Sequence, residues 1–285
     1  MKFGIIKERK NPPDRRVVFS PAALLSLKEQ YPQVEFKVES SDIRVFSDEE
    51  YTQLGIEVVN DVSDCDVLLG VKEVPVDYLI PNTSYFFFSH TIKKQPYNRA
   101  LLQTVLKKNI SLFDHETIVD ANDKRLIGFG KYAGIVGTYN AFRAFGIKFE
   151  LFKLPKAETL DGKEALITYL KRPVLPPVKI VVTGTGKVGS GCKEILDAMK
   201  VKQVSVDHFL SKNFTQPVYV LIDVLDYNKR LDGESKDNID FYKHPKEYKS
   251  DFERFTKVAD IAIMGHFHAN EAPTILSQEM LNASN

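Results

Sequence analysis

The chain has 285 residues, 43% hydrophobic and 27% charged, and its 39 basic residues nearly balance its 38 acidic residues. This composition is typical of a globular protein with enough apolar side chains for about two packed domains, and it excludes disorder as the default state. A charge balance this even provides no electrostatic footprint for a nucleic acid or an anionic membrane.

Two further features limit the class of protein. No apolar run approaches the roughly 20 residues that a membrane helix needs, and residues 1–8 lack the apolar core of a signal peptide. The two cysteines, Cys65 and Cys192, are too few for a disulfide framework or a cysteine-based zinc site. These features favour a cytoplasmic protein that does not bind membranes.

Short apolar runs alternate with longer amphipathic runs, which predicts an α/β protein. In the first half, strands are expected at residues 3–6, 34–38, 67–69, 85–88 and 110–113, with helices at 21–30, 48–54 and 97–107 between them. A further helix is expected at 131–145, and its glycines Gly134 and Gly137 would allow close packing against a neighbour.

Prolines cluster between residues 154 and 177 and mark the approach to a second unit. Beyond them we expect strands at 178–182, 204–206, 218–224 and 258–264, a helix at 188–200 and a long surface insertion at 227–250. The domain boundary is therefore expected near residue 140, with an N-terminal domain at 1–140 and a second domain at 141–285.

Residues 184–189 read Gly-Thr-Gly-Lys-Val-Gly, a G-x-G-x-x-G pattern between an expected strand and an expected helix. In such a turn Gly184 permits the tight bend, Gly186 lets the backbone approach a pyrophosphate, and Gly189 allows the helix to pack closely on the strand. The helix N-terminus then offers N–H groups to the phosphates. The pattern predicts NAD(P) binding by this turn, with Lys187 and Val188 among the contacts.

The same fingerprint expects an acidic residue about 20 positions further on, and Asp207 stands there. A carboxylate at that place would accept hydrogen bonds from the adenosine ribose and disfavour a 2′-phosphate, so Asp207 slightly favours NAD. Lys212 lies close enough in the sequence to keep NADP open.

Ionisable residues follow three expected strands of the first half: Lys72, His90 and Glu116. Since the carboxyl ends of parallel strands face the ligand crevice of an open sheet, these residues are expected to converge there. A lysine acts as a base only where its site lowers its pKa from about 10.4, whereas a histidine titrates near neutrality. Arg16 suits a bidentate contact with a carboxylate. The set suits proton transfer beside a dinucleotide, although each residue alone is also compatible with a solvated surface charge.

His266 and His268 flank Phe267 at the end of the last expected strand. Residues two apart on a strand share a face, which a metal pair requires, but no third ligand has a helpful spacing. We therefore expect no metal site and place the pair near the cofactor crevice.

Several stretches spread over the whole chain match the sequence pattern of one known family. They are residues 15–21, 70–73, 87–93, 114–116, 125–134, 226–227, 242–250 and 272–276. The most specific piece is Phe-Ser-His-Thr-Ile-Lys at 88–93. These stretches resemble the saccharopine dehydrogenase and lysine–ketoglutarate reductase branch of the alanine dehydrogenase–transhydrogenase superfamily. The resemblance implies two Rossmann-like domains with parallel sheets around a cleft, the first holding substrate and the catalytic groups and the second binding NAD(P).

The resemblance also implies roles for individual residues. Lys72 and His90 match the acid–base pair of the branch, and the substrate site is matched by Arg16, Lys93, Glu116 and Arg125. The implied small-molecule partners are an amino acid and a 2-oxo acid: the ε-amine of lysine and 2-oxoglutarate form an imine, and a hydride is delivered to the imine carbon, or the reverse.

The family usually continues beyond residue 285, so the second domain is expected to lack the usual C-terminal segment. Two alternatives therefore stay open. One is an alanine dehydrogenase-like enzyme that uses pyruvate and ammonia, and the other is a truncated nucleotide-binding homologue without turnover. The sequence leaves open NAD against NADP and the formation of a homo-oligomer.

Overall fold

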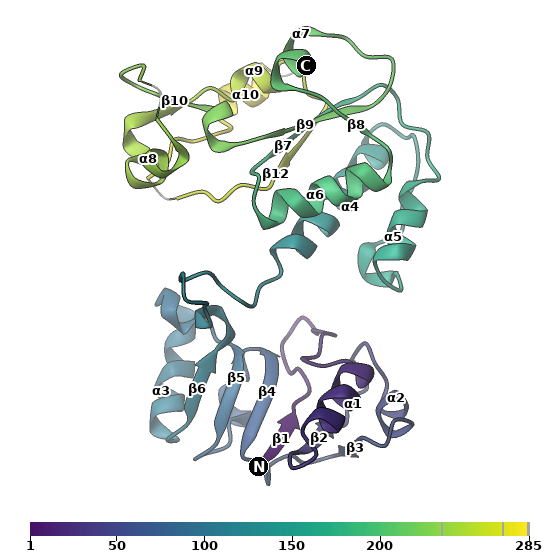
Figure 1. Cartoon of the computed structure of the whole chain (residues 1–285), viewed down its shortest axis with the longest axis vertical. Coiled ribbons are helices and arrows are strands. Elements are labelled where there is room, and N and C mark those ends of the chain that lie inside the picture. Colours follow the sequence, from purple (N-terminus) through teal and green to yellow (C-terminus); the bar gives the residue numbers. More distant parts are fainter. Residues whose placement is uncertain (235, 270, 284–285) are drawn as a thin grey trace. The chain divides into compact units, whose positions relative to one another are not determined.

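A computed structural model describes residues 1–234, 236–269 and 271–283 of the chain, which divides into two compact units, Met1–Gly128 and Phe129–Asn285 (Figure 1). Each unit combines helices with a sheet of parallel strands, so the predicted α/β class is confirmed. Within the described ranges, no helix is both long and apolar enough to cross a membrane.

Unit 1 is built on one six-stranded sheet. Its strands are β1 (Lys2–Ile5), β2 (Glu35–Glu39), β3 (Glu57–Val59), β4 (Val67–Lys72), β5 (Ser84–Phe88) and β6 (Ser111–Asp114). Its helices are α1 (Pro21–Gln30), α2 (Asp48–Thr52) and α3 (Arg99–Lys107), with single 3₁₀ turns η1 (Val76–Tyr78), η2 (Thr91–Lys93), η3 (Pro96–Asn98) and η4 (His115–Thr117).

The six strands run parallel in the order β3-β2-β1-β4-β5-β6. Successive side chains of a strand point to opposite faces of the sheet, and each face has its own core. Ile5 and Val38 pack with residues of α1 and α2 in one core. Leu68 and Phe87 pack with residues of α3 in the other. The strand order reverses at β1 and β4. In such sheets ligands bind beyond the carboxyl ends of the strands, near the reversal.

Unit 2 holds a smaller parallel sheet and a separate antiparallel pair of strands. The sheet strands are β7 (Lys179–Thr183), β8 (Lys202–Gln203), β9 (Val218–Ile222) and β12 (Ile261–Met264), and the antiparallel pair is β10 (Asn228–Arg230) and β11 (Tyr248–Ser250). The helices are α4 (Gly130–Lys148), α5 (Lys163–Leu170), α6 (Lys187–Ala198), α7 (Val206–Ser211), α8 (Asn238–Lys243), α9 (Glu253–Thr256) and α10 (Gln278–Asn282), with 3₁₀ turns η5 (Ala157–Thr159), η6 (Val224–Asp226) and η7 (Pro245–Glu247). The sheet order is β12-β7-β9-β8.

Two helices of unit 2, α4 and α6, touch through their backbones. A Cβ atom on Gly134 would lie 2.0 Å from the carbonyl oxygen of Val188, and one on Gly191 would lie 2.0 Å from that of Lys131. Gly134 therefore permits the close packing that the sequence predicted, whereas a Cβ on Gly137 would meet nothing within 4 Å. This contact makes α4 part of unit 2, so the units divide at residues 128 and 129 rather than near 140.

Two sequence expectations for unit 2 were wrong. Residues 227–250 were expected to be a surface insertion, but Tyr227, Phe241 and Tyr248 are buried in one core with residues of β9 and α9. These buried aromatic residues could not be predicted because they are widely spaced in a segment rich in turn-forming residues. The strand expected at 204–206 is the short β8 at 202–203, because Ser205 caps and thereby starts α7.

Candidate functional site

The glycine-rich turn lies between β7 and α6. Gly184 has a φ of +88°, a left-handed conformation that glycine adopts without strain. A Cβ on Gly184 would also lie 2.8 Å from the Cα of His266, so the turn packs against the segment that follows β12. His266 thus lies beside the glycine-rich turn.

The other two glycines of the pattern, Gly186 and Gly189, differ in how much space surrounds them. A Cβ on Gly189 would lie 1.8 Å from the carbonyl oxygen of Gly184, so only glycine lets α6 approach the turn. A Cβ on Gly186 would meet nothing within 4 Å, and its φ of −79° suits any residue. The atoms of the described residues therefore do not require glycine at 186; they leave open space there.

That open space lies at the N-terminus of α6. Gly186 precedes the helix and has no side chain that could cap it, and the helix begins with Lys187 and Val188. The first backbone N–H groups of a helix lack intrahelical acceptors and carry the positive end of its dipole. Open space in front of them suits a phosphate group, so these residues fit the pyrophosphate of NAD(P).

The structure does not bring Asp207 to this turn. Asp207 lies on α7, is exposed, and follows β8, which pairs with β9 and not with β7. Two strand spacings, roughly 9–10 Å, therefore separate the end of β8 from the turn. The expectation rested on a count of 20 residues, which assumes that the second strand of the fold lies beside the first.

Asp223 occupies the place that Asp207 was expected to fill. It directly follows β9, the neighbour of β7, and the N–H of Gly184 donates to the carbonyl of Ile222 at 2.8 Å. The half-buried carboxylate of Asp223 accepts hydrogen bonds from the N–H of Val224 and the amide of Asn238, each at 2.7 Å. Sequence reasoning missed Asp223, although an acid directly after an apolar strand was an available signal.

In unit 1, four of the predicted site residues meet at Glu116. Its carboxylate is 5% exposed and contacts Nδ1 of His90 at 3.0 Å, Nζ of Lys93 at 3.1 Å and the guanidinium of Arg125 at 2.8 Å. His90 comes from the turn after β5, with a φ of 55°, and Glu116 from the turn after β6. The convergence of strand ends predicted for His90 and Glu116 is therefore found, and Lys93 and Arg125 join them.

Burial alone would raise the pKa of Glu116. Hydrogen bonds from His90 and Lys93 and the charges of Lys93 and Arg125 overcome that effect, so its pKa lies below the ordinary value. Glu116 is therefore an anion at neutral pH. Nδ1 of His90 also lies 3.3 Å from Nζ of Lys93, but its contact with the carboxylate is shorter, at 3.0 Å, so we assign the ring proton to Nδ1 and leave Nε2 as the acceptor nitrogen.

A buried pair of side chains ties these two turns together. The hydroxyl of Ser89 donates to Oδ2 of Asp114 at 2.5 Å, and Oδ1 of Asp114 accepts the N–H of Glu116 at 2.8 Å. Ser89 is fully buried and Asp114 nearly so. Ser89 precedes His90 in the chain, so this pair fixes His90 relative to Glu116.

Lys72 lies at the end of β4, where the strand is irregular. The register between β4 and β5 shifts between Leu69 and Lys72, and Lys72 then pairs with Phe88, two residues before His90. No described contact joins the Lys72 side chain to the Glu116 cluster. The candidate acid–base groups thus sit on adjacent strand ends without touching.

Two buried side chains, which we call the Glu8 clamp, hold the irregular end of β4. The carboxylate of Glu8 accepts the N–H of Val71 at 2.7 Å and that of Lys72 at 2.9 Å. Nε2 of His115 lies 3.1 Å from the carbonyl oxygen of Gly70. Burial raises the pKa of Glu8 and lowers the pKa of His115, which favours a neutral imidazole donating to Gly70. The clamp positions the backbone of Lys72.

Arg16 belongs to a second group of charged residues in unit 1. Its guanidinium pairs with Asp14 at 2.6 Å, and this hydrogen bond raises the pKa of Arg16, with the charge of Glu8 contributing. Arg16 is therefore near Glu8, and Lys72 is near enough to Asp14 to lower its pKa. The predicted substrate residues form two groups, one around Glu116 and one around Glu8 and Asp14.

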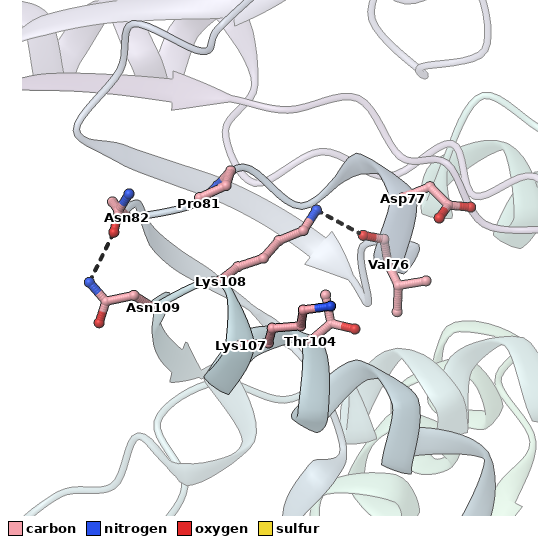
Figure 2. Close-up of a pocket in the computed structure, with 8 residues that line it drawn as sticks. All are labelled: Val76, Asp77, Pro81, Asn82, Thr104, Lys107, Lys108 and Asn109. Carbon is pink, nitrogen blue, oxygen red and sulfur yellow. Dashed lines mark hydrogen bonds between the residues drawn. The ribbon is translucent and has the colours of Figure 1, made fainter.

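A hollow of about 500 Å³ in unit 1 lies elsewhere (Figure 2). Asn82 and Asn109 on its wall precede β5 and β6, so it opens at the amino ends of these strands, opposite the candidate site. The Nζ of Lys108 donates to the carbonyls of Val76 and Leu79, at 3.4 and 2.6 Å, and the two asparagines bond at 3.0 Å. Its polar groups serve the protein itself, and we assign it no role.

No cluster of three or more histidine, cysteine, aspartate or glutamate side chains in the described ranges has an arrangement that would hold a metal ion. His266 and His268 have ring centroids 6.3 Å apart, and Nδ1 of His266 is engaged by Thr183 at 2.7 Å.

Comparison with known proteins assigns the N-terminal part of the chain. Residues 4–136 match the family model of the alanine dehydrogenase/PNT N-terminal domain. Among solved structures, an L-alanine dehydrogenase is 17% identical with a TM-score of 0.58, and the transhydrogenase from Sinorhizobium meliloti is 15% identical with a TM-score of 0.60. Both cover 100% of this chain, and 72% and 75% of their own chains are covered. These likenesses confirm the Rossmann-like fold.

Curated relatives are similar over more of the sequence. The alpha-aminoadipic semialdehyde synthase of Arabidopsis thaliana is 28% identical over 98% of this chain, and that of Bos taurus is 28% identical over 85%. The saccharopine dehydrogenase [NAD(+), L-lysine-forming] of Yarrowia lipolytica is 25% identical over 59%. The chain spans only 30%, 29% and 50% of the lengths of these three relatives. Residues 4–136 are therefore similar to an alanine dehydrogenase/PNT N-terminal domain, and the predicted resemblance of the chain to the saccharopine dehydrogenase and lysine–ketoglutarate reductase branch is confirmed.

Proposed function

We propose that this chain is an NAD(P)-dependent oxidoreductase of the saccharopine dehydrogenase or lysine–ketoglutarate reductase type, acting on the CH–NH group of an amino acid. The observation that carries the proposal is the Glu116 cluster, in which one buried carboxylate beyond the carboxyl end of β6 contacts a histidine and two cations. Relatives whose names describe dehydrogenases of this type support the choice of substrate class.

The residues of unit 1 would handle protons and carboxylates. The ε-amine of lysine and the keto group of 2-oxoglutarate condense to an imine and water, and reduction of the imine carbon gives the secondary amine. His90, with its Nδ1 held by Glu116, would give or take the proton through Nε2, and Lys72 on the adjacent strand end would be its acid–base partner. Arg16, Lys93 and Arg125 would attract the carboxylates of the substrates.

The residues of unit 2 would hold the dinucleotide. When bound, NAD(P) supplies or accepts the hydride. Gly184, Gly186 and Gly189 would shape the turn for the pyrophosphate, with the N–H groups of Lys187 and Val188 directed at it. We assign the ribose contact to Asp223 in place of Asp207, because Asp223 ends the strand beside β7. A carboxylate there disfavours a 2′-phosphate, so we propose NAD.

The test is oxidation of NADH and NADPH by the purified chain with lysine plus 2-oxoglutarate, followed by the absorbance of the reduced nicotinamide. We expect turnover that falls by roughly a hundredfold or more in Lys72→Met and in His90→Gln. Lys107→Met, an exposed lysine on α3, is the matched control and should keep the wild-type rate.

The outcomes separate the alternatives. Turnover with pyruvate plus ammonia, without a need for lysine, would identify an alanine dehydrogenase-like enzyme. Dinucleotide binding without turnover for any amino acid and 2-oxo acid pair would refute catalysis and favour the nucleotide-binding homologue.

A further inference from the structure

His266 lies where the second half of a bound dinucleotide would pass. The turn at Gly184 ends β7, which has β9 on one side and β12 on the other. Asp223 follows β9, and His266 follows β12 after a single residue, Gly265. The dinucleotide carries a ribose on each side of its pyrophosphate, so a pyrophosphate at α6 directs one half toward Asp223 and the other toward His266.

We propose that His266 is a proton-linked binding residue for the dinucleotide, contacting the phosphate or ribose of the half that lies over β12. This proposal rests on the proposed nucleotide site. It adds a residue that the glycine fingerprint does not contain, and it makes the affinity for the dinucleotide depend on pH.

Hydrogen bonds around Thr183 fix the tautomer of His266. The hydroxyl oxygen of Thr183 accepts the N–H of Gly265 at 3.2 Å and lies 2.7 Å from Nδ1 of His266 and 3.7 Å from the sulfur of Met264. Nitrogen is the nearer and stronger acceptor, so the Thr183 hydroxyl donates to Nδ1. The neutral ring therefore carries its proton on Nε2, which is the donor left for another acceptor.

Among the described residues, the contacts of His266 include no carboxylate that would stabilise a second proton. The groups that face it are the Thr183 hydroxyl from β7, the ring of Tyr227 at 5.7 Å and the ring of His268 at 6.3 Å. Burial raises the pKa of Tyr227, and the charges of Asp223 and Asp226 contribute, whereas neither carboxylate acts on His266. Burial, reinforced by His268, lowers the pKa of His266, so the free protein holds this ring neutral at neutral pH.

A bound pyrophosphate would reverse this balance. Its two negative charges favour the imidazolium form, so binding raises the pKa of His266 and takes up a proton as the pH falls. Affinity should therefore increase on acidification, by up to about tenfold for each unit by which the ligand raises that pKa. The pyrophosphate itself stays ionised across this range, so the dependence belongs to the protein.

The experiment measures NADH binding to the full chain by nicotinamide fluorescence between about pH 8 and about pH 5.5, the range in which a histidine titrates. Calorimetry in two buffers of different ionisation heat gives the protons taken up by the wild-type chain. In His266→Asn the amide oxygen can still accept from Thr183, but the side chain cannot titrate. The matched controls are His268→Asn and His208→Asn.

We expect wild-type affinity to rise severalfold toward low pH with net proton uptake, both effects to vanish in His266→Asn, and both to persist in the two controls. Binding that is independent of pH, or proton uptake that persists in His266→Asn, overturns the role of His266 while leaving the nucleotide site intact. An absence of binding at every pH overturns the proposed function and this inference with it. Calorimetry on the wild-type chain decides on proton uptake even if the variant fails to fold.

Discussion

Replacing Glu8 by glutamine tests whether the Glu8 clamp positions Lys72. The carboxylate uses both oxygens, one on the N–H of Val71 and one on that of Lys72, at 2.7 and 2.9 Å. Glutamine retains one acceptor oxygen and brings an NH₂ group against the second N–H, which is then left without a partner. An unsatisfied buried N–H costs about 1–3 kcal/mol, so we expect a local loss of about 2 kcal/mol in Glu8→Gln.

Hydrogen–deuterium exchange resolves this local loss. A loss of about 2 kcal/mol corresponds to roughly thirtyfold faster exchange, and we expect it in the peptide covering Val71 and Lys72. Glu39→Gln is the matched control, because Glu39 is equally buried and accepts the N–H of Lys7 at 3.0 Å. In that variant the oxygen that now pairs with Arg9 is the one that is lost, Lys7 keeps an acceptor, and Lys72 should stay protected. If the amide of Lys72 exchanges at the wild-type rate in Glu8→Gln, the clamp is refuted, whatever the global stability of the variant.

Three further predictions concern the two sites. Gly189→Ala should destabilise unit 2 by about 3 kcal/mol or more, since its Cβ would overlap a carbonyl oxygen, whereas Gly186→Ala should keep the urea midpoint and weaken dinucleotide binding at least tenfold. Asp223→Asn should weaken NADH binding about tenfold and narrow the preference over NADPH, while Asp207→Asn should change neither dissociation constant. The pKa of Glu116 is lowered in the folded chain, so its carboxylate stabilises the fold above the ordinary glutamate pKa of about 4.3, and this contribution is lost as the pH falls through the lower folded value. Urea denaturation should therefore show Glu116→Gln to be less stable than wild type at neutral pH, with the difference shrinking toward about pH 3.

Much of the fold follows from local patterns in the sequence. The strands β1, β4, β5 and β7 are short apolar runs followed by turn residues, and such runs predict buried parallel strands wherever they occur. The three residues of β3 are too few to show a period, and the aromatic residues of 227–250 are too far apart to reveal that they share a core. The misplacement of the unit boundary has a similar cause. Only the contact of Gly134 with α6 reveals which unit holds α4.

In the candidate site, some residues could be predicted from the local sequence and others only from the order of the strands. Lys72, His90 and Glu116 follow apolar runs, so their places at strand ends could be predicted. Asp207 could not be excluded, because the lateral order of strands depends on long-range packing and not on the distance along the chain. Asp223 is the better candidate only once β9 is known to lie between β7 and β8.

Both strand ends that carry candidate acid–base residues depart from regular geometry. β4 shifts register just before Lys72, and His90 adopts a left-handed conformation that costs a non-glycine residue of order 1 kcal/mol or more. Each departure is held by buried polar side chains from neighbouring segments: the Glu8 clamp at β4, and Asp114 at the turn before His90. Ordinary strand pairing would satisfy the same backbone groups without buried carboxylates, whose desolvation is costly. The buried carboxylates are therefore best explained by the need to aim Lys72 and His90, rather than by stability.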